Sequence, residues 1–570
     1  MQSALNIKNT ITLIIQLLKS IVMQLKSLHT SIFLILFGCL SPLLSQVDAP
    51  KLVVVLSVDQ MRAEYLDRYD NKFGQNGFKK LIGEGYQFKN GHFNYMPTET
   101  GPGHAAIYTG ATPAISGVIG NGWYDRSKKK SVNVVSENDK YQTIGAPDSI
   151  ATGRAGPDHL LVTTIADELK LASQFRSKTV SVSIKDRSAI LGGGHTSDGS
   201  YWYDGLTGKF ITSSYYMDAL PDWVDSFNNN GMVDSISKLT WDLSFPLSEY
   251  TASRSDDSRY EYKFRGKKTP TFPYNFSEMN AGFDSYFLIP YTPFSNDLLV
   301  SFAEEAIINE QLGQDDDTDF LAIGFSSTDY SGHAFGPYSV EIEDLYIKLD
   351  RTIENLINLL DQTVGKNEYI LVLSSDHGAV PAPRYLRSLK LPGGINNPNA
   401  LAFLTNTHIK KVFDIDTIIL YNNNMSFYLD YDKLEGEDQF NEVSKEIKRL
   451  LEKDQTILSV HTRESIQSIS SEGSGPDQLL KNGYFPERSG DIFFISRPGW
   501  FGITTRIATS HGTPFSYDTH VPIIFYGKGI PQGSTVRKVN VTEIAPSISF
   551  LCGVMIPNGS TGEVLIELFK

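Results

Sequence analysis

The sequence predicts an α/β fold built on a doubly wound, mostly parallel sheet that is sandwiched by helices. The main observation is three apolar runs, each followed by an aspartate within a few residues: residues 51–58, 320–326 and 369–375. Buried parallel strands read as continuous apolar runs of this kind. Two more strand candidates and a long amphipathic helix supply the alternation that the fold requires, at 179–184, 521–526 and 339–362.

Composition limits the class of protein. The chain has 570 residues, with 41% hydrophobic and 20% charged residues, which is ordinary for a globular protein with a large core. Its formal net charge is -14, and no basic stripe offsets it. This argues against a nucleic-acid-binding surface, although a local field in a pocket can still attract a small anion.

Residues 1–45 are expected to be a secretory signal peptide, with Met23 as the expected true start. Lys26 precedes the apolar run 32–37, and small residues follow it. A membrane anchor is disfavoured because the apolar stretch spans only about 13 residues, fewer than a membrane-spanning helix needs. A lipid anchor at Cys39 remains an alternative. We therefore expect a periplasmic or secreted protein without an intramolecular disulfide, because Cys552 would be its only cysteine.

One catalytic domain is expected over residues 47–570. Between 190 and 315 the periodicity fades and aromatic, Ser, Gly and Pro residues dominate, so we expect a cap of loops and short strands there. Residues 390–500 are expected to form a smaller α+β insertion. Its helix at 437–452 has one apolar face, and a strand is expected at 491–496.

Candidate metal ligands follow the predicted strands. Asp59 follows the first strand directly, and two loops each offer Asp and His after their strands, at the edge where ligands gather in open α/β sheets. Asp and His oxygen and nitrogen atoms suit a borderline divalent ion such as zinc. With a late histidine the set has six members, which exceeds one tetrahedral site and suits two ions: Asp59, Asp329, His333, Asp376, His377 and His511.

Thr100 is the candidate nucleophile. It lies shortly before a segment, 105–109, that reads as a helix start, where backbone donors and the helix dipole favour negative charge. A divalent ion on its hydroxyl oxygen would stabilise the alkoxide. The alternative is that Thr100 is a plain helix cap, which the segment alone favours.

Lys185 and Arg187 are candidates for binding an anion. They close the β-rich run at 179–184, and residues two apart in an extended segment point the same way. An Arg fork matches phosphate oxygens and a Lys adds a point charge. The alternative is an exposed basic strand end.

Together these segments resemble the alkaline phosphatase superfamily, and most closely its threonine-nucleophile, PafA-type monoesterase branch, which is related to type I phosphodiesterase/nucleotide pyrophosphatases. The resemblance runs from about residue 50 to the end of the chain. The motifs that carry it lie at 56–62, 97–104, 120–125, 185–187, 327–337, 375–378 and 517–522.

The resemblance implies a role for each matching residue. One zinc ion would be held by Asp329, His333 and His511. The second would be held by Asp59, Asp376 and His377, with Thr100 beside it. The non-bridging phosphoryl oxygens would be held by Asn121, Lys185 and Arg187. Of these assignments, that of the last histidine ligand is the least specific. His520 lies nine residues after His511 and is the alternative ligand.

The function that follows is an exported, two-zinc alkaline phosphatase of broad substrate range. It would hydrolyse small phosphate monoesters through a phosphothreonine intermediate and release inorganic phosphate. The extra charge of a monoester dianion explains the added Lys185 and Arg187 and favours a monoesterase. The alternative is a phosphodiesterase of the same superfamily, and a non-enzymatic surface binding protein is disfavoured by the intact ligand set. We expect a monomer that binds no nucleic acid and spans no membrane after the signal is removed.

Overall fold

A ten-stranded sheet is the largest sheet formed by the described residues of the computed structural model. Its strand order is β20-β2-β19-β12-β1-β11-β6-β7-β8-β5. Its neighbours from β12 to β7 pair in parallel, whereas β19 is antiparallel to both of its neighbours. The predicted mostly parallel α/β fold is therefore confirmed. The strands are β1 (Leu52–Val58), β2 (Tyr86–His92), β5 (Thr143–Ile144), β6 (Thr179–Ser183), β7 (Gly199–Asp204), β8 (Lys209–Ser213), β11 (Asp319–Phe325), β12 (Tyr369–Ser374), β19 (His520–Gly527) and β20 (Gly533–Asn540).

The structure describes residues 49–569, except for 137–139, 148, 280–285, 424, 471–472, 474 and 503–506. The expected signal peptide at 1–45, the expected start at Met23 and the possible lipid anchor at Cys39 lie outside the described residues. Within the described residues, no helix combines the length and the apolar character needed to cross a bilayer. Cys552 is buried and unpaired.

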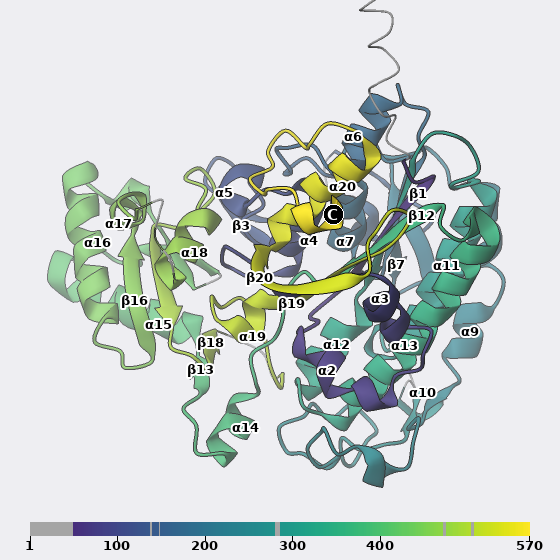
Figure 1. Ribbon diagram of the computed structural model, residues 1–570. Coiled ribbons are helices and arrows are strands. Elements are labelled where there is room, and N and C mark those ends of the chain that lie inside the picture. The colour runs from purple at the N-terminus through teal and green to yellow at the C-terminus, as the bar shows by residue number, and fades with distance from the viewer. Residues whose placement is uncertain are drawn as a thin grey trace, which may run out of the picture. The chain divides into compact units, whose positions relative to one another are not determined.

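Helices cover both faces of the sheet because successive side chains of a strand point to opposite faces (Figure 1). In β1, Val54 and Leu56 join the apolar cluster that contains α3 (Phe78–Glu84), α11 (Phe294–Asn309) and α13 (Val340–Leu360). Val53 and Val55 join the cluster on the other face, with α4 (Thr100–Thr109), α6 (Ile165–Ala172) and α20 (Ile544–Cys552). The continuous apolar runs of the sequence thus correspond to strands buried on both sides.

The region 190–315 contributes more to the central sheet than its sequence predicts. Its strands β7 and β8 extend that sheet, and α11 packs on one face of it. The sequence analysis expected loops and short strands here and did not assign β7 to the central sheet, because β7 is filled by buried aromatic residues, among them Trp202, instead of an aliphatic run. A small sheet of β9 (Thr240–Trp241) and β10 (Tyr274–Asn275) and several short helices lie between β8 and α11.

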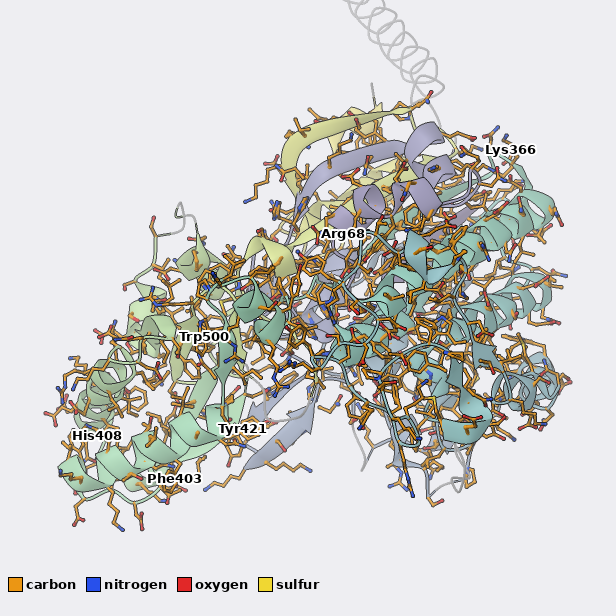
Figure 2. All side chains as sticks on the ribbon, turned by 90° about the horizontal axis from the view of Figure 1, so that it is seen from below. Arg68, Lys366, Phe403, His408, Tyr421 and Trp500 are labelled. Carbon is orange, nitrogen blue, oxygen red and sulfur yellow. The ribbon has the colours of Figure 1, made fainter. Side chains whose placement is uncertain are left out.

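The segment 390–500 has a sheet and an apolar cluster of its own. Its strands run in the order β14-β15-β17-β16, and α15 (Pro398–Phe413) and α16 (Glu437–Leu451) pack with them. Tyr421 of this sheet, labelled in Figure 2, stacks on Tyr124 of β3 (Gly122–Asp125) at a centroid distance of 5.9 Å. This contact joins the two parts. The strands are β14 (Ile419–Asn423), β15 (Ser426–Leu429), β16 (Ile457–Thr462) and β17 (Ile492–Ser496).

A second junction joins this segment to the loop that precedes Thr100. The backbone N–H of Met96 donates to the carbonyl of Leu479 in α18 (Pro476–Gly483) at 3.0 Å. The side-chain amide of Asn482 donates to the carbonyl of Asn94 at 2.7 Å. The side chain of Met96 is itself part of the apolar cluster of the 390–500 segment. The loop that leads to Thr100 is therefore held by both parts of the protein.

Candidate active site

The predicted site residues gather at the carboxyl ends of four neighbouring strands. Asp59 directly follows β1, and Asp376 follows β12 by two residues. β1 pairs in parallel with both β11 and β12, so the residues after these strands meet at one edge. Lys185 follows β6, which is the next strand beyond β11. The site therefore lies where the fold class places ligands.

Two groups of potential metal ligands form at this edge. The ligand atoms of Asp329, His333 and His511 all lie within 4.8 Å of one another. The same holds for Asp59, Asp376 and His377. The structure thus brings together all six residues that the sequence analysis named, in the two groups that the resemblance implies. Their role as ligands stays a prediction.

The three histidines of these groups share one orientation. In His333, His377 and His511 the Nδ1 atom lies 2.8–2.9 Å from a backbone carbonyl, of Thr509, Gly378 and Thr98 respectively. A carbonyl only accepts, so Nδ1 carries the proton and the lone pair is on Nε2. This arrangement is typical of metal-binding histidines, whose second nitrogen is fixed by an acceptor.

Unpaired polar atoms test whether the site fits a cation. Asp59 Oδ1, Asp376 Oδ2 and His377 Nε2 are buried and accept no hydrogen bond from the described residues; His104 Nδ1 lies 3.3 Å from Asp376 Oδ2, but it lies closer, at 2.9 Å, to the carbonyl of Thr100. Burial and then the charges of Asp329 and Asp376 raise the pKa of Asp59 well above its usual range. Buried polar groups are rarely left unpaired, and a divalent cation would satisfy these three at once. The residues present therefore fit a metal ion.

Lys185 connects the two groups. Its Nζ lies 2.6 Å from Asp59 Oδ2 and 2.6 Å from Asp329 Oδ2, one carboxylate from each group. The same atom lies 3.4 Å from Thr100 Oγ1. Thr100 is 1% exposed. The hydroxyl of Thr100 therefore lies close to the Lys185 amine, which itself contacts both ligand groups.

Arg187 and Asn121 complete the predicted set. Arg187 Nε is buried and has no hydrogen-bond partner among the described residues. Asn121 is half-buried, and its Oδ1 accepts from the N–H of Gly101 at 2.8 Å. Its own backbone N–H donates to Glu99. This leaves the Asn121 amide hydrogens beside the first turn of α4, where they can reach an anion.

Local structure differs from the sequence prediction at three of these positions. Asp329 and His333 lie in α12 (Ser327–Phe335), one turn apart on one helix face, and not in a loop. The helix containing Thr100 begins at Thr100 and not at 105, and Glu99 is the residue that precedes it. Thr100 is therefore not in the capping position.

The extended geometry assumed for Lys185 and Arg187 is also wrong. β6 ends at Ser183, Lys185 precedes α7 (Asp186–Gly193), and Arg187 lies in its first turn. Short polar segments after a strand give no periodicity, so the start of this helix was not predicted. Both side chains nevertheless lie near the carboxylates of Asp59 and Asp329, whose charges act on them.

His520, the alternative ligand, lies elsewhere. It begins β19, stacks on His92 at 4.7 Å and contacts the carbonyl of Lys89 through Nε2. Residues that the sequence analysis did not assign also contact the site. Gln60 donates from its side chain to Asp329 and from its backbone to Asp376. Its positive φ of 64° turns the chain there, and no pattern in the sequence signals it.

His104 is a second residue that supports the site. Its Nδ1 lies 2.9 Å from the carbonyl of Thr100 and 3.3 Å from Asp376 Oδ2. Its Nε2 lies 3.0 Å from Ser57 Oγ. His104 therefore ties the first turn of α4 to the second ligand group.

Comparison with known proteins places the chain in a family. The family model described as type I phosphodiesterase / nucleotide pyrophosphatase matches residues 53–518. The chain belongs to this family, which is part of the alkaline phosphatase superfamily. The resemblance stated from the sequence is thus confirmed.

Individual relatives are similar over almost the whole chain. Alkaline phosphatase PhoV of Synechococcus elongatus is 39% identical over 535 residues, covering 92% of this chain and 94% of the relative. Alkaline phosphatase PafA of Elizabethkingia meningoseptica is 40% identical over 528 residues, covering 92% and 95%. A Myroides odoratus protein, also 40% identical, over 533 residues, covering 92% and 96%, bears a different name, calcium-transporting ATPase.

A crystal structure of wild-type PafA has a TM-score of 0.88 to this chain at 40% identity, covering 92% of this chain and 99% of that one. The fold class is confirmed by this match. The predicted enzyme class, a phosphoric monoester hydrolase, is confirmed by the alkaline phosphatases at about 40% identity.

Proposed function

We propose that this protein is an exported, zinc-dependent alkaline phosphatase that acts on small phosphate monoesters through a phosphothreonine intermediate. The observation that supports this most directly is the position of Thr100. Its buried hydroxyl lies 3.4 Å from Lys185 Nζ, and that amine contacts one carboxylate of each metal-ligand group. A phosphoryl group placed there would meet a nucleophile, a cation and two sets of metal ligands.

The chain's own residues have distinct roles in this proposal. Thr100 Oγ1 forms a bond to phosphorus while the bond from phosphorus to the alcohol oxygen of the substrate breaks. Water then releases inorganic phosphate from the threonine. Lys185, Arg187 and the Asn121 amide hold non-bridging oxygens, and the first turn of α4 adds backbone donors. Two zinc ions, held by the six ligands, would supply the Lewis-acid charge that such a transfer needs.

The relatives support the same assignment. Two of the three similar proteins are named alkaline phosphatases. A second solved PafA chain, with a TM-score of 0.86 and 39% identity, covering 92% of this chain and 99% of that one, is a mutant altered at a threonine, an asparagine, a lysine and an arginine. These are the residue types of Thr100, Asn121, Lys185 and Arg187. A monomer of broad substrate range is part of the same proposal.

Phosphodiesterase activity is the second candidate, because the family model is named for it. The Lys185 and Arg187 pair favours the monoester, whose phosphoryl group carries one more negative charge than that of a diester. A direct comparison of kcat/KM for p-nitrophenyl phosphate and bis-p-nitrophenyl phosphate decides between the two. The monoester should be preferred by the wild-type enzyme.

Trapping the intermediate tests the nucleophile. Enzyme mixed with a ³²P-labelled monoester and quenched in acid should carry label on the peptide that contains Thr100. The Thr100→Ala variant should carry no label and lose most turnover, with a melting temperature close to wild type because Thr100 is not a capping residue. Label on another peptide, or near-normal rates in the variant, would contradict the proposal.

A further inference from the structure

A cavity of about 860 Å³ lies against the helix that carries His333. It is lined by the 259–263 loop, by α14 (Pro383–Ser388), and by residues near 394, 500 and 508. Two of its lining residues are bonded to the helix that carries His333. The N–H of Tyr262 donates to the carbonyl of Ala334 at 2.7 Å, and the N–H of Ala508 donates to the carbonyl of His333 at 2.8 Å. The cavity therefore packs against α12, the helix that carries the candidate ligands Asp329 and His333.

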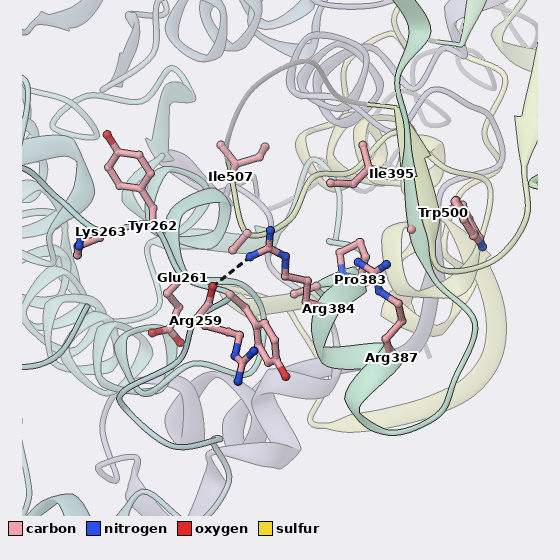
Figure 3. Close-up of a pocket in the computed structure, with 14 residues that line it drawn as sticks. Arg259, Glu261, Tyr262, Lys263, Pro383, Arg384, Arg387, Ile395, Trp500 and Ile507 are labelled. Atoms are coloured by element: carbon pink, nitrogen blue, oxygen red, sulfur yellow. Dashed lines mark hydrogen bonds between the residues drawn. The ribbon is translucent and has the colours of Figure 1, made fainter. Parts of the chain in front are cut away.

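Three arginines line this cavity, and their charges are not neutralised. Arg259, Arg384 and Arg387 form no ion pair with any residue that the structure describes, and all three are exposed. Figure 3 shows the Arg384 guanidinium in the middle of the cavity, where it donates to the carbonyl of Arg259 at 3.4 Å. That bond brings two arginines from separate segments together.

The carboxylate in the lining does not offset these charges. Glu261 is turned inward, where its side chain is fully buried and pairs with Arg254 at 2.8 Å. The whole chain carries a net charge of -14, so a cavity lined by three unpaired cations has the opposite sign to the protein as a whole. Like charges held together without partners cost free energy, and a bound anion would offset that cost.

The cavity also has apolar walls. The side chains of Ile395 and Ile507 lie on either side of Arg384 (Figure 3), and Trp500 lines the same cavity. Arginine forks suit phosphate oxygens, and apolar walls suit the carbon skeleton of a substrate. A free inorganic anion would use only the first of these features.

We infer that this cavity, called here the arginine cavity, binds a second phosphate group of substrates that are phosphorylated at two positions. This inference rests on the proposed phosphatase function. One phosphate would be placed at Thr100 while the leaving group extends into the arginine cavity, where Arg259, Arg384 and Arg387 would hold its second phosphate. The arginine cavity would thereby set a preference for bisphosphorylated leaving groups.

A matched pair of substrates tests this inference. The kcat/KM values of fructose 1,6-bisphosphate and fructose 6-phosphate are measured for wild type and for an Arg384→Gln, Arg387→Gln double variant. The double variant should lose about tenfold on the bisphosphate and less than twofold on the monophosphate, since each contact is partly screened by solvent. In wild type the preference for the bisphosphate should shrink as salt rises.

A charge-matched control separates the cavity from general electrostatics. The Arg351→Gln, Lys366→Gln double variant removes two exposed positive charges elsewhere; Figure 2 shows Lys366 far from Trp500. It should leave the substrate ratio unchanged. Equal losses on both substrates in the Arg384 and Arg387 variant, or no loss, would overturn the inference.

Two further outcomes have defined meanings. A double variant that keeps the substrate ratio but loses binding to phosphatidylglycerol vesicles would make the arginine cavity a membrane contact and overturn the inference. Wild-type protein that hydrolyses neither sugar phosphate nor p-nitrophenyl phosphate would instead contradict the proposed function. Normal turnover of p-nitrophenyl phosphate in the double variant would show that the catalytic centre itself is intact.

Discussion

The imidazole rings of His377 and His511 stack with their centroids 3.6 Å apart and their planes 17° from parallel. Each ring belongs to a different group of metal ligands. The two groups are therefore in direct contact, and a change in one ligand is expected to disturb the other group. Residues of a contacting unit rarely act additively.

Substitution of the two late histidines distinguishes a ligand from a packing residue. His511→Ala should lower bound zinc from about two ions per chain to about one or fewer, and should lower the melting temperature of the zinc-loaded protein, because bound metal stabilises the folded state. The measurement is elemental analysis of dialysed protein with thermal unfolding. His520→Ala is the matched control and should keep both ions. Loss of zinc in the His520 variant alone would reverse the assignment.

Removal of the metals should abolish activity and reduce stability together. Three carboxylates of the site are buried, and without a cation their mutual repulsion is opposed mainly by Lys185. Chelation followed by re-addition of zinc should restore the rate and the melting temperature in parallel. Full activity at one ion or fewer per chain would disprove the two-metal site.

Loss of the Lys185 and Arg187 charges should affect monoesters more than diesters. A charge-assisted contact to a buried phosphoryl oxygen contributes roughly 1.5 to 3 kcal/mol. Lys185→Ala with Arg187→Ala should therefore lower monoester kcat/KM by about two to four orders of magnitude and diester kcat/KM by far less. Equal losses on both substrates would indicate that the pair serves structure or general positioning.

Two buried glutamates predict a pH dependence of stability. Burial, and for Glu261 also the charge of Glu341, raises the pKa of both carboxyls above their ordinary value of 4.5. Arg254, at 2.8 Å from Glu261, lowers the pKa of that carboxyl by less than burial raises it, and Glu341 Oε1 accepts from the hydroxyl of Tyr274 at 2.5 Å. The pair therefore holds protons in the folded state that it gives up when unfolded.

Above pH 4.5 these two carboxyls bind more protons in the folded state than in the unfolded chain, so their contribution should make the free energy of unfolding fall as pH rises from about 5 to 9. Glu341→Gln should flatten this fall, as measured by denaturant unfolding at a fixed saturating zinc concentration. Glu464→Gln, at an exposed position, should leave it unchanged. A wild-type curve that rises over this interval would refute the assignment.

The junction between α18 and the Met96 loop should affect both stability and catalysis. A Cβ on Gly483 would lie 1.7 Å from the carbonyl oxygen of Met96, so Gly483→Ala must displace backbone. We expect a loss of roughly 1 to 3 kcal/mol of stability and a lower kcat, because this loop leads to Thr100. Gly83 lies in helix α3, and a Cβ there would meet no atom within 4 Å, so Gly83→Ala should be neutral or stabilising. An unchanged kcat in the Gly483 variant would show that this junction does not affect catalysis.

The sequence was most informative where strands are buried on both faces. The apolar runs ending before Asp59 and Asp376 predicted the central strands, and the residues after them became the site because parallel strands share one carboxyl edge. Aromatic β7 was missed because its burial comes from packing against other elements and not from an aliphatic pattern. Gln60 was missed because its role depends on a backbone turn that the sequence does not signal. The start of α7 was missed because a short polar segment has no hydrophobic periodicity from which a helix could be predicted.

The carbonyl groups that orient the three site histidines belong to the main chain at Thr98, Gly378 and Thr509. No side-chain substitution at these positions deletes such an acceptor; only a change in the path of the loop can move it. The hydroxyls of Thr98 and Thr509 are themselves buried and donate to the carbonyls of Thr513 and Val380, so these side chains help to fix the path of the loops. A substitution that breaks one of these bonds, or an insertion or deletion in either loop, would shift the carbonyl that orients His511 or His333 and so alter the centre without touching a ligand.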